Sequence, residues 1–152
     1  MNEQPDNYRG NGLAMVIGIL SAVFAATFFF GALLHLGLEI PLGFTVLQEP
    51  IIVPATIVEG LCGVALAVAA VTVLTRKGWA WTAAVAAHGF ALGGVVLGIV
   101  ALAVGAGPTT ELNTIYHRVM LVALVAMLAL LISPVGRTAF RRASRPTVLQ
   151  SR

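Results

Sequence analysis

The sequence predicts an all-α protein: an integral membrane bundle of four antiparallel helices, with both chain ends in the cytoplasm. Two observations carry this prediction. The chain of 152 residues is 59% hydrophobic and only 10% charged, whereas soluble domains are about a quarter charged. Four apolar stretches, at residues 12–38, 54–75, 79–105 and 113–132, are each long enough to cross a bilayer.

Charge and cysteine content narrow the class further. A pI near 9.8 would also suit a nucleic-acid-binding protein, but the basic residues form short patches between apolar runs, as at the ends of membrane helices. We therefore expect no nucleic-acid partner. The single cysteine, Cys62, excludes an intrachain disulfide and a thiol–disulfide oxidoreductase that needs a cysteine pair. The first apolar run is too long for a signal-peptide core, so no signal peptide is expected.

Residues 1–11 are polar and are predicted to form a short cytoplasmic tail. The span at 12–38 carries no charge, and its small residues recur every three or four positions on one stripe that leads to His35. Such a stripe lets another helix approach closely, so His35 is expected to face protein rather than lipid. The stripe consists of Ala14, Gly18, Ser21, Ala25 and Ala32.

Residues 39–53 join the first two spans. Pro41, Gly43 and Pro50 disfavour a continuous helix there, yet the segment is rich in Ile, Leu, Val and Phe. It is interpreted either as a lid over a pocket or as an anchor in the membrane interface.

The span at 54–75 starts with Pro54, which suits a first helical turn, and carries one carboxylate, Glu59. A tight turn at 76–78 leads into the 79–105 span. That span has a long stripe of small residues, suited to close packing within the bundle or to a homodimer. The stripe consists of Ala87, Ala91, Gly94, Gly98, Ala101 and Gly105, and His88 flanks it.

Residues 109–113 offer several N-caps for the last span, 113–132, which Ser133 and Pro134 end. Residues 134–152 are predicted to be a basic cytoplasmic tail. Arg9, Arg76, Lys77 and the tail arginines fall on one side of a four-span chain, and the positive-inside rule makes that side the cytoplasm. The protein is therefore expected to be a multi-pass protein of the cell membrane.

This topology brings five polar residues of different spans to one level near the outer surface: His35, Glu59, Tyr116, His117 and Arg118. His88 lies deeper, toward the cytoplasm. Ionisable groups at membrane depth are costly and often functional. We therefore predict an outward-facing polar pocket for a ligand or a partner at this level.

Several interpretations of this layer remain open. Glu59 could pair with Arg118, or bond a histidine, as a purely structural contact. His35, Glu59 and His117 form a ligand set suited to a divalent metal such as Zn or Fe. His35 and His117 could instead be the two axial ligands of haem b. Proton or ion conduction would have few polar groups to use between this layer and the cytoplasm, chiefly His88, Thr27, Thr72 and Ser21.

Four short spans, a proline-containing outer loop and the stretch VEGLCGVALAVAA around Glu59 and Gly63 resemble the DoxX/DoxD-like membrane proteins. The resemblance implies a small four-helix membrane protein associated with quinone-linked or other redox partners, often as an accessory subunit. We therefore expect an accessory subunit that binds a small molecule or a partner membrane protein, rather than a stand-alone enzyme. The alternative is a metal- or haem-b-binding redox protein.

Overall fold

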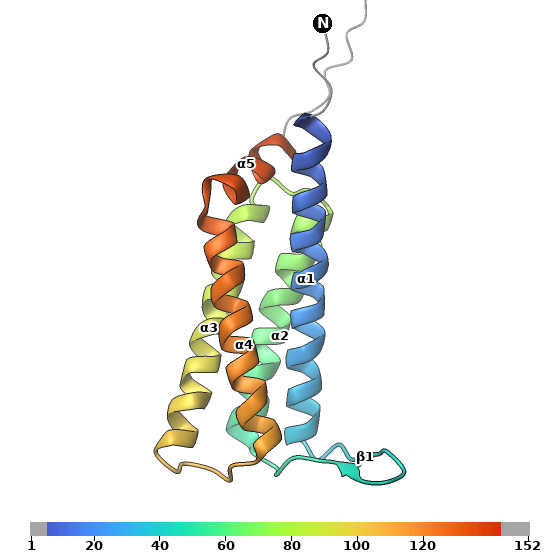
Figure 1. Cartoon of the computed structure of the whole chain (residues 1–152), viewed down its shortest axis with the longest axis vertical. Coiled ribbons are helices and arrows are strands. Elements are labelled where there is room, and N and C mark those ends of the chain that lie inside the picture. Colours follow the sequence, from blue (N-terminus) through green and yellow to red (C-terminus); the bar gives the residue numbers. More distant parts are fainter. Residues whose placement is uncertain (1–5, 144–152) are drawn as a thin grey trace, which may run out of the picture.

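A computed structural model of the chain describes residues 6–143, with side chains for residues 12–141. Four long helices run antiparallel along one axis, and each packs on the next in the chain (Figure 1). All four are long and apolar enough to cross a membrane. The predicted all-α fold with four such helices is confirmed. The helices are α1 (Asp6–His35), α2 (Val53–Leu74), α3 (Ala80–Ala103) and α4 (Glu111–Ile132).

The first helix differs most from its predicted bounds. It begins at Asp6 rather than at residue 12, so residues 6–11 extend the helix instead of forming a tail. The single Gly10 in this stretch costs a helix only about 1 kcal/mol, which the rest of a long helix offsets. Residues 1–5 of the predicted tail lie outside the described residues.

Three helices end in the same backbone motif. The second residue after each has a positive φ: Gly37 after α1 (96°), Arg76 after α2 (54°) and Gly105 after α3 (70°). This left-handed residue turns the next amides back onto the final helical carbonyls, as in the 2.9 Å bond from the Lys77 N–H to the Thr72 carbonyl. Glycine adopts this conformation without strain, whereas arginine does not.

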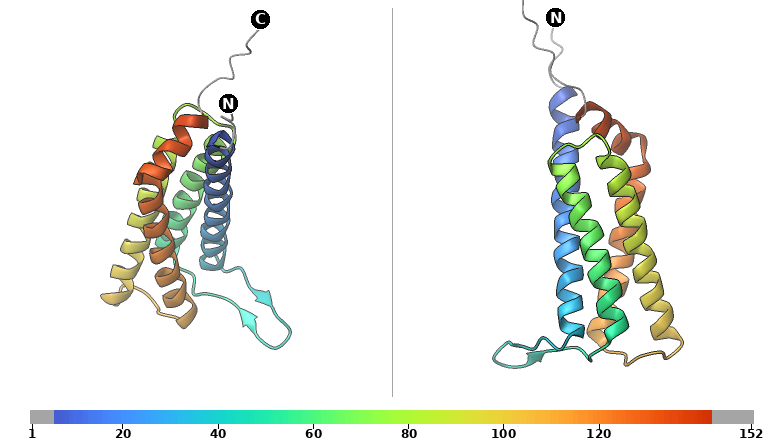
Figure 2. Two further views of the ribbon diagram at one scale, coloured as in Figure 1. Left: turned by 45° about the horizontal axis from the view of Figure 1, so that its top comes forward. Right: turned by 180° about the vertical axis from the view of Figure 1, so that it is seen from behind.

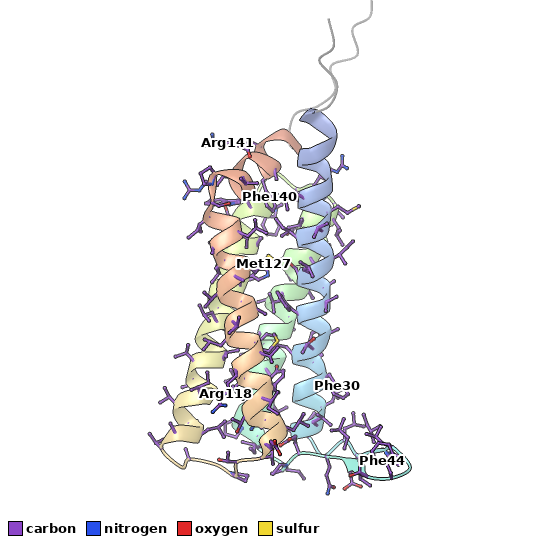
Figure 3. The ribbon with its side chains drawn as sticks, in the orientation of Figure 1. Phe30, Phe44, Arg118, Met127, Phe140 and Arg141 are labelled. Carbon is purple, nitrogen blue, oxygen red and sulfur yellow. The ribbon has the colours of Figure 1, made fainter. Side chains whose placement is uncertain are left out.

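Residues 39–52 form no helix, as expected, and include a small hairpin. Strands β1 (Ile40–Pro41) and β2 (Val46–Leu47) pair antiparallel, and Gly43 begins the turn between them with a φ of 85°. The hairpin projects sideways from the bundle, with Phe44 at its tip (Figures 1, 2 and 3). We call this end of the bundle, which also holds the α3–α4 connection, the hairpin end.

Small residues bring the helices together, as the stripes predicted. Gly18 of α1 faces Leu74 of α2, and Gly94 of α3 faces the thiol of Cys62. At both glycines an added Cβ would lie 2.7 Å from the neighbouring side chain, so the close approach depends on its absence. The α1 stripe is largely buried between helices, notably at Ala14, Ser21, Ala25, Ala32 and His35. The interior part of the α3 stripe thus packs within the bundle.

The segment after Ser133, which was predicted as a basic tail, begins with a further helix. Helix α5 (Pro134–Ala143) crosses the end of the bundle and packs mainly on α1 (Figures 1 and 3). Ser133 caps α5 by accepting a 3.1 Å hydrogen bond from the Gly136 amide. The side chain of Phe140, in the same helix, is buried. A serine N-cap followed by proline is a known helix-start signal, so the sequence already indicated a helix that begins at Pro134. Residues 144–152 of the predicted tail lie outside the described residues.

Large apolar side chains face outward along all four long helices. In a water-soluble bundle the apolar residues form one inward stripe per helix, whereas here both faces are apolar. Exposed examples are Val23 (51%), Leu61 (54%), Leu97 (57%) and Val122 (69%). Such a surface suits hydrocarbon rather than water, which supports the assignment as a membrane protein.

Candidate functional site

Polar residues from α1, α2 and α4 meet at the hairpin end. His35 lies at the last residue of α1, Glu59 in the second turn of α2, and His117 in the second turn of α4. All three are buried, with exposed fractions of 8% or less. They line one cavity of about 270 Å³ between α2, α3 and α4. Three of the five residues of the predicted polar layer therefore line one cavity.

A second, smaller cavity lies on the other side of Glu59, against α1 and the hairpin segment. Its volume is about 110 Å³, and Tyr116 and Glu49 help to line it. His35, Glu59 and Asn113 border both cavities. Glu59 therefore lies between the two spaces.

The position of Glu59 depends on a glycine of the neighbouring helix. Gly31 of α1 faces the carboxylate so closely that an added Cβ would lie 2.7 Å from Oε2. Oε2 is buried and has no hydrogen-bond partner among the described residues. A buried carboxyl oxygen without a partner costs free energy, and the rest of the helix packing has to offset this cost.

The histidines share one hydrogen-bonding pattern. Nδ1 of His35 lies 3.1 Å from the Pro50 carbonyl, and Nδ1 of His117 lies 2.9 Å from the Asn113 carbonyl. A carbonyl oxygen only accepts, so Nδ1 carries the proton in each ring. In the neutral rings, Nε2 is then a hydrogen-bond acceptor. The His117 ring lies against Gly98 of α3, where a Cβ would overlap its Nε2.

Three site residues escaped the sequence prediction: Glu49, Thr110 and Asn113. The Thr110 hydroxyl caps α4 by accepting the Asn113 amide at 3.0 Å, and it lies 2.7 and 2.8 Å from the two carboxylate oxygens of Glu49. This contact fastens the hairpin segment to the start of α4, where a carboxylate is also favoured by the helix dipole. Asn113 was expected only as a helix cap, but its Oδ1 is buried and has no partner within residues 6–143.

Arg118 lies outside both cavities. It is exposed on α4 (Figure 3) and lines neither cavity. The predicted pair with Glu59 is absent from the described part of the chain. Successive residues of a helix point about 100° apart, so α4 cannot direct both His117 and Arg118 toward Glu59.

The two cofactor hypotheses gain no geometric support. Among the described residues, no group of three or more His, Cys, Asp or Glu side chains could hold a metal ion. His35, Glu59 and His117 thus line one cavity without converging on one point. For haem b, the His117 ring would have to face an open slot, but it lies against the Gly98 backbone.

His88 lies apart from this site, as predicted. It is fully buried in the core, where Nδ1 lies 2.8 Å from the Ala84 carbonyl and the ring meets Phe24 edge-on. Its Nε2 has no partner in the described part of the chain.

Comparison of the chain with protein-family models, curated proteins and solved structures gave no match. The functional argument therefore depends on the geometry of the hairpin end.

Proposed function

We propose that this protein is a multi-pass protein of the cell membrane that binds a small molecule in the cavity between α2, α3 and α4. The observation that carries the proposal is a cavity lined by two buried polar residues, Glu59 and Asn113, each with one side-chain oxygen that lacks a partner among the described residues. Buried polar groups are almost always satisfied, and polar residues at membrane depth often mark binding sites. A ligand that bonds the Glu59 and Asn113 side chains in the cavity would offset the cost of burying them.

The charges favour an orientation with the hairpin end outside the cell. Arg76, Lys77 and Arg137 lie near the opposite end of the bundle, where both described chain ends also lie (Figures 1 and 2). Glu39, Glu49 and Glu111 lie at the hairpin end. The positive-inside rule then places both termini in the cytoplasm. In this orientation the cavity faces the outer leaflet or the outside.

We propose an accessory role rather than stand-alone catalysis. The resemblance of the stretch around Glu59 and Gly63 to DoxX/DoxD-like proteins is the reason to propose a redox-linked partner subunit in the same membrane. A bound metal or haem b is the alternative, and elemental analysis and an absorption spectrum of the purified protein distinguish these cases.

A cavity-filling variant tests the binding proposal. Ala101 lines the cavity from α3, so Ala101→Leu reduces its volume, whereas Ala86→Leu on the exposed face of the same helix does not. We expect mass spectrometry of solvent extracts to show an organic molecule that copurifies with wild type and Ala86→Leu but not with Ala101→Leu. Equal amounts in all three proteins would contradict a ligand in this cavity.

A further inference from the structure

We infer that the ligand of this cavity is a small lipophilic organic amine, bound as its ammonium ion with the nitrogen toward Glu59. This inference rests on the proposed binding function and goes further, because it names the chemical class of the ligand. It follows from the hydrogen-bonding character, the charge, the walls and the size of the cavity.

Most of the polar groups that line the cavity are acceptors. Glu59 contributes carboxyl oxygens, and Asn113 contributes an amide whose oxygen accepts and whose NH2 group donates. His35 directs Nδ1 to a backbone carbonyl, which leaves Nε2 as the acceptor of its neutral ring, whereas Nε2 of His117 lies against Gly98. A complementary ligand must therefore supply hydrogen-bond donors. An ammonium group supplies up to three donors and accepts none.

The charge of the site points the same way. Among the described residues that line the two cavities, Glu49 and Glu59 are acidic and none is Lys or Arg. The nearby Arg118 is exposed. A buried carboxyl group stays ionised only beside an opposite charge or several donors, and no Lys or Arg of the described lining supplies that charge. A cationic ligand does.

Other ligand classes fit less well. A metal ion would need several ligating side chains at one point, and no such group exists among the described residues. An anion would meet the uncompensated Glu59. The start of α4 would attract an anion, but Glu49 already occupies it through Thr110. A purely apolar molecule would leave the oxygens of Glu59 and Asn113 without partners.

The other lining residues and the cavity volume indicate the apolar character and the size of the ligand. Val58, Leu97 and Leu102 contribute apolar surface to the lining. A cavity of about 270 Å³ corresponds to about nine water molecules at their volume in the liquid. This volume suits an amine of about ten non-hydrogen atoms with an apolar arm.

Calorimetric titration of the full-length protein in detergent tests the inference with two matched probes. Phenylbutylamine carries the ammonium group, and phenylbutanol has the same arm with a neutral hydroxyl. We expect wild type to bind the amine about tenfold more tightly than the alcohol, because a hydrogen bond to a charged group is the stronger one. Glu59→Gln keeps the side-chain size and should remove this preference.

Glu111→Gln is the matched control, because Glu111 is an exposed carboxylate at the same end that lines neither cavity. It should retain the preference for the amine. An equal loss in Glu111→Gln would overturn the inference, since general charge attraction would then explain binding. Equal affinity of wild type for both probes, abolished in Ala101→Leu, would overturn the amine assignment and leave the cavity function standing. Binding of neither probe, while an organic molecule still copurifies, would overturn the amine assignment in the same way.

Discussion

Gly31 of α1 and Glu59 of α2 form a matched pair across the α1–α2 interface of the site. The glycine leaves the space that the carboxylate occupies, and a Cβ there would lie 2.7 Å from Oε2. Because Gly31 has no side chain, α1 and α2 can approach closely. The same space holds the Glu59 carboxylate, and Glu59 borders both cavities.

Gly31→Ala should therefore disturb the site more than the fold. The carboxylate must turn away, at a cost of roughly 1 kcal/mol for a displaced rotamer, while alanine gains a similar amount as the better helix former. Thermal unfolding in detergent should show little net change. Gly93→Ala is the control, because no described atom lies within 4 Å of a Cβ at that exposed position. It should be more stable than Gly31→Ala by about 1 kcal/mol.

A double-mutant cycle assigns this difference to the carboxylate. In a Glu59→Ala background, Gly31→Ala and Gly93→Ala should have the same effect on the free energy of unfolding, since the displaced group is gone. Persistence of the difference would mean that another part of the α1–α2 interface is responsible.

Thr110→Val should destabilise the hairpin end. The substitution keeps the shape of the side chain but removes the cap of α4 and the donor to Glu49. Loss of a cap costs about 1 kcal/mol, and the unpartnered carboxylate adds to this, so we expect a loss of about 2 kcal/mol in thermal or denaturant unfolding. Thr110→Ser should restore most of it. The neighbouring Thr109 is exposed, so an equal loss in Thr109→Val would contradict this assignment.

The sequence predicted the helices better than the site for a physical reason. Four long apolar runs determine four helices almost alone, and the small-residue stripe that ends at His35 correctly predicted a buried face. The depth of Glu59 and His117 followed from counting turns from the helix starts. Counting turns does not show how α4 is rotated about its own axis. The sequence therefore did not show that His117 points into the bundle and Arg118 points out of it.

Counting helical turns cannot predict the contacts that irregular segments make. Glu49 reaches Thr110 across 61 positions of sequence through a segment whose course no periodicity determines. Helix α5 is a different case. Ser133 and Pro134 were interpreted only as the end of one helix, although serine followed by proline also favours the start of another.

Arg76→Gly should stabilise the protein. Arg76 holds the left-handed conformation that closes α2, with a φ of 54°, and this costs a non-glycine residue roughly 1–2 kcal/mol. Glycine removes the strain but loses more chain entropy on folding, so we expect a net gain of about 0.5–1 kcal/mol in thermal unfolding. Lys77→Gly, at the next position, has no positive φ to relieve and should not stabilise. A gain of the same size at Lys77 would point to charge removal instead.

Cysteine labelling in intact cells tests the orientation that places the cavity outside. Glu111 lies at the hairpin end and Arg76 at the opposite end, and both are exposed. The native Cys62 is fully buried, so its background reaction should be low. A membrane-impermeant maleimide should label Glu111→Cys in intact cells and label Arg76→Cys only after permeabilisation. The reverse pattern would place the hairpin end in the cytoplasm, and the ligand would then have to enter from that side.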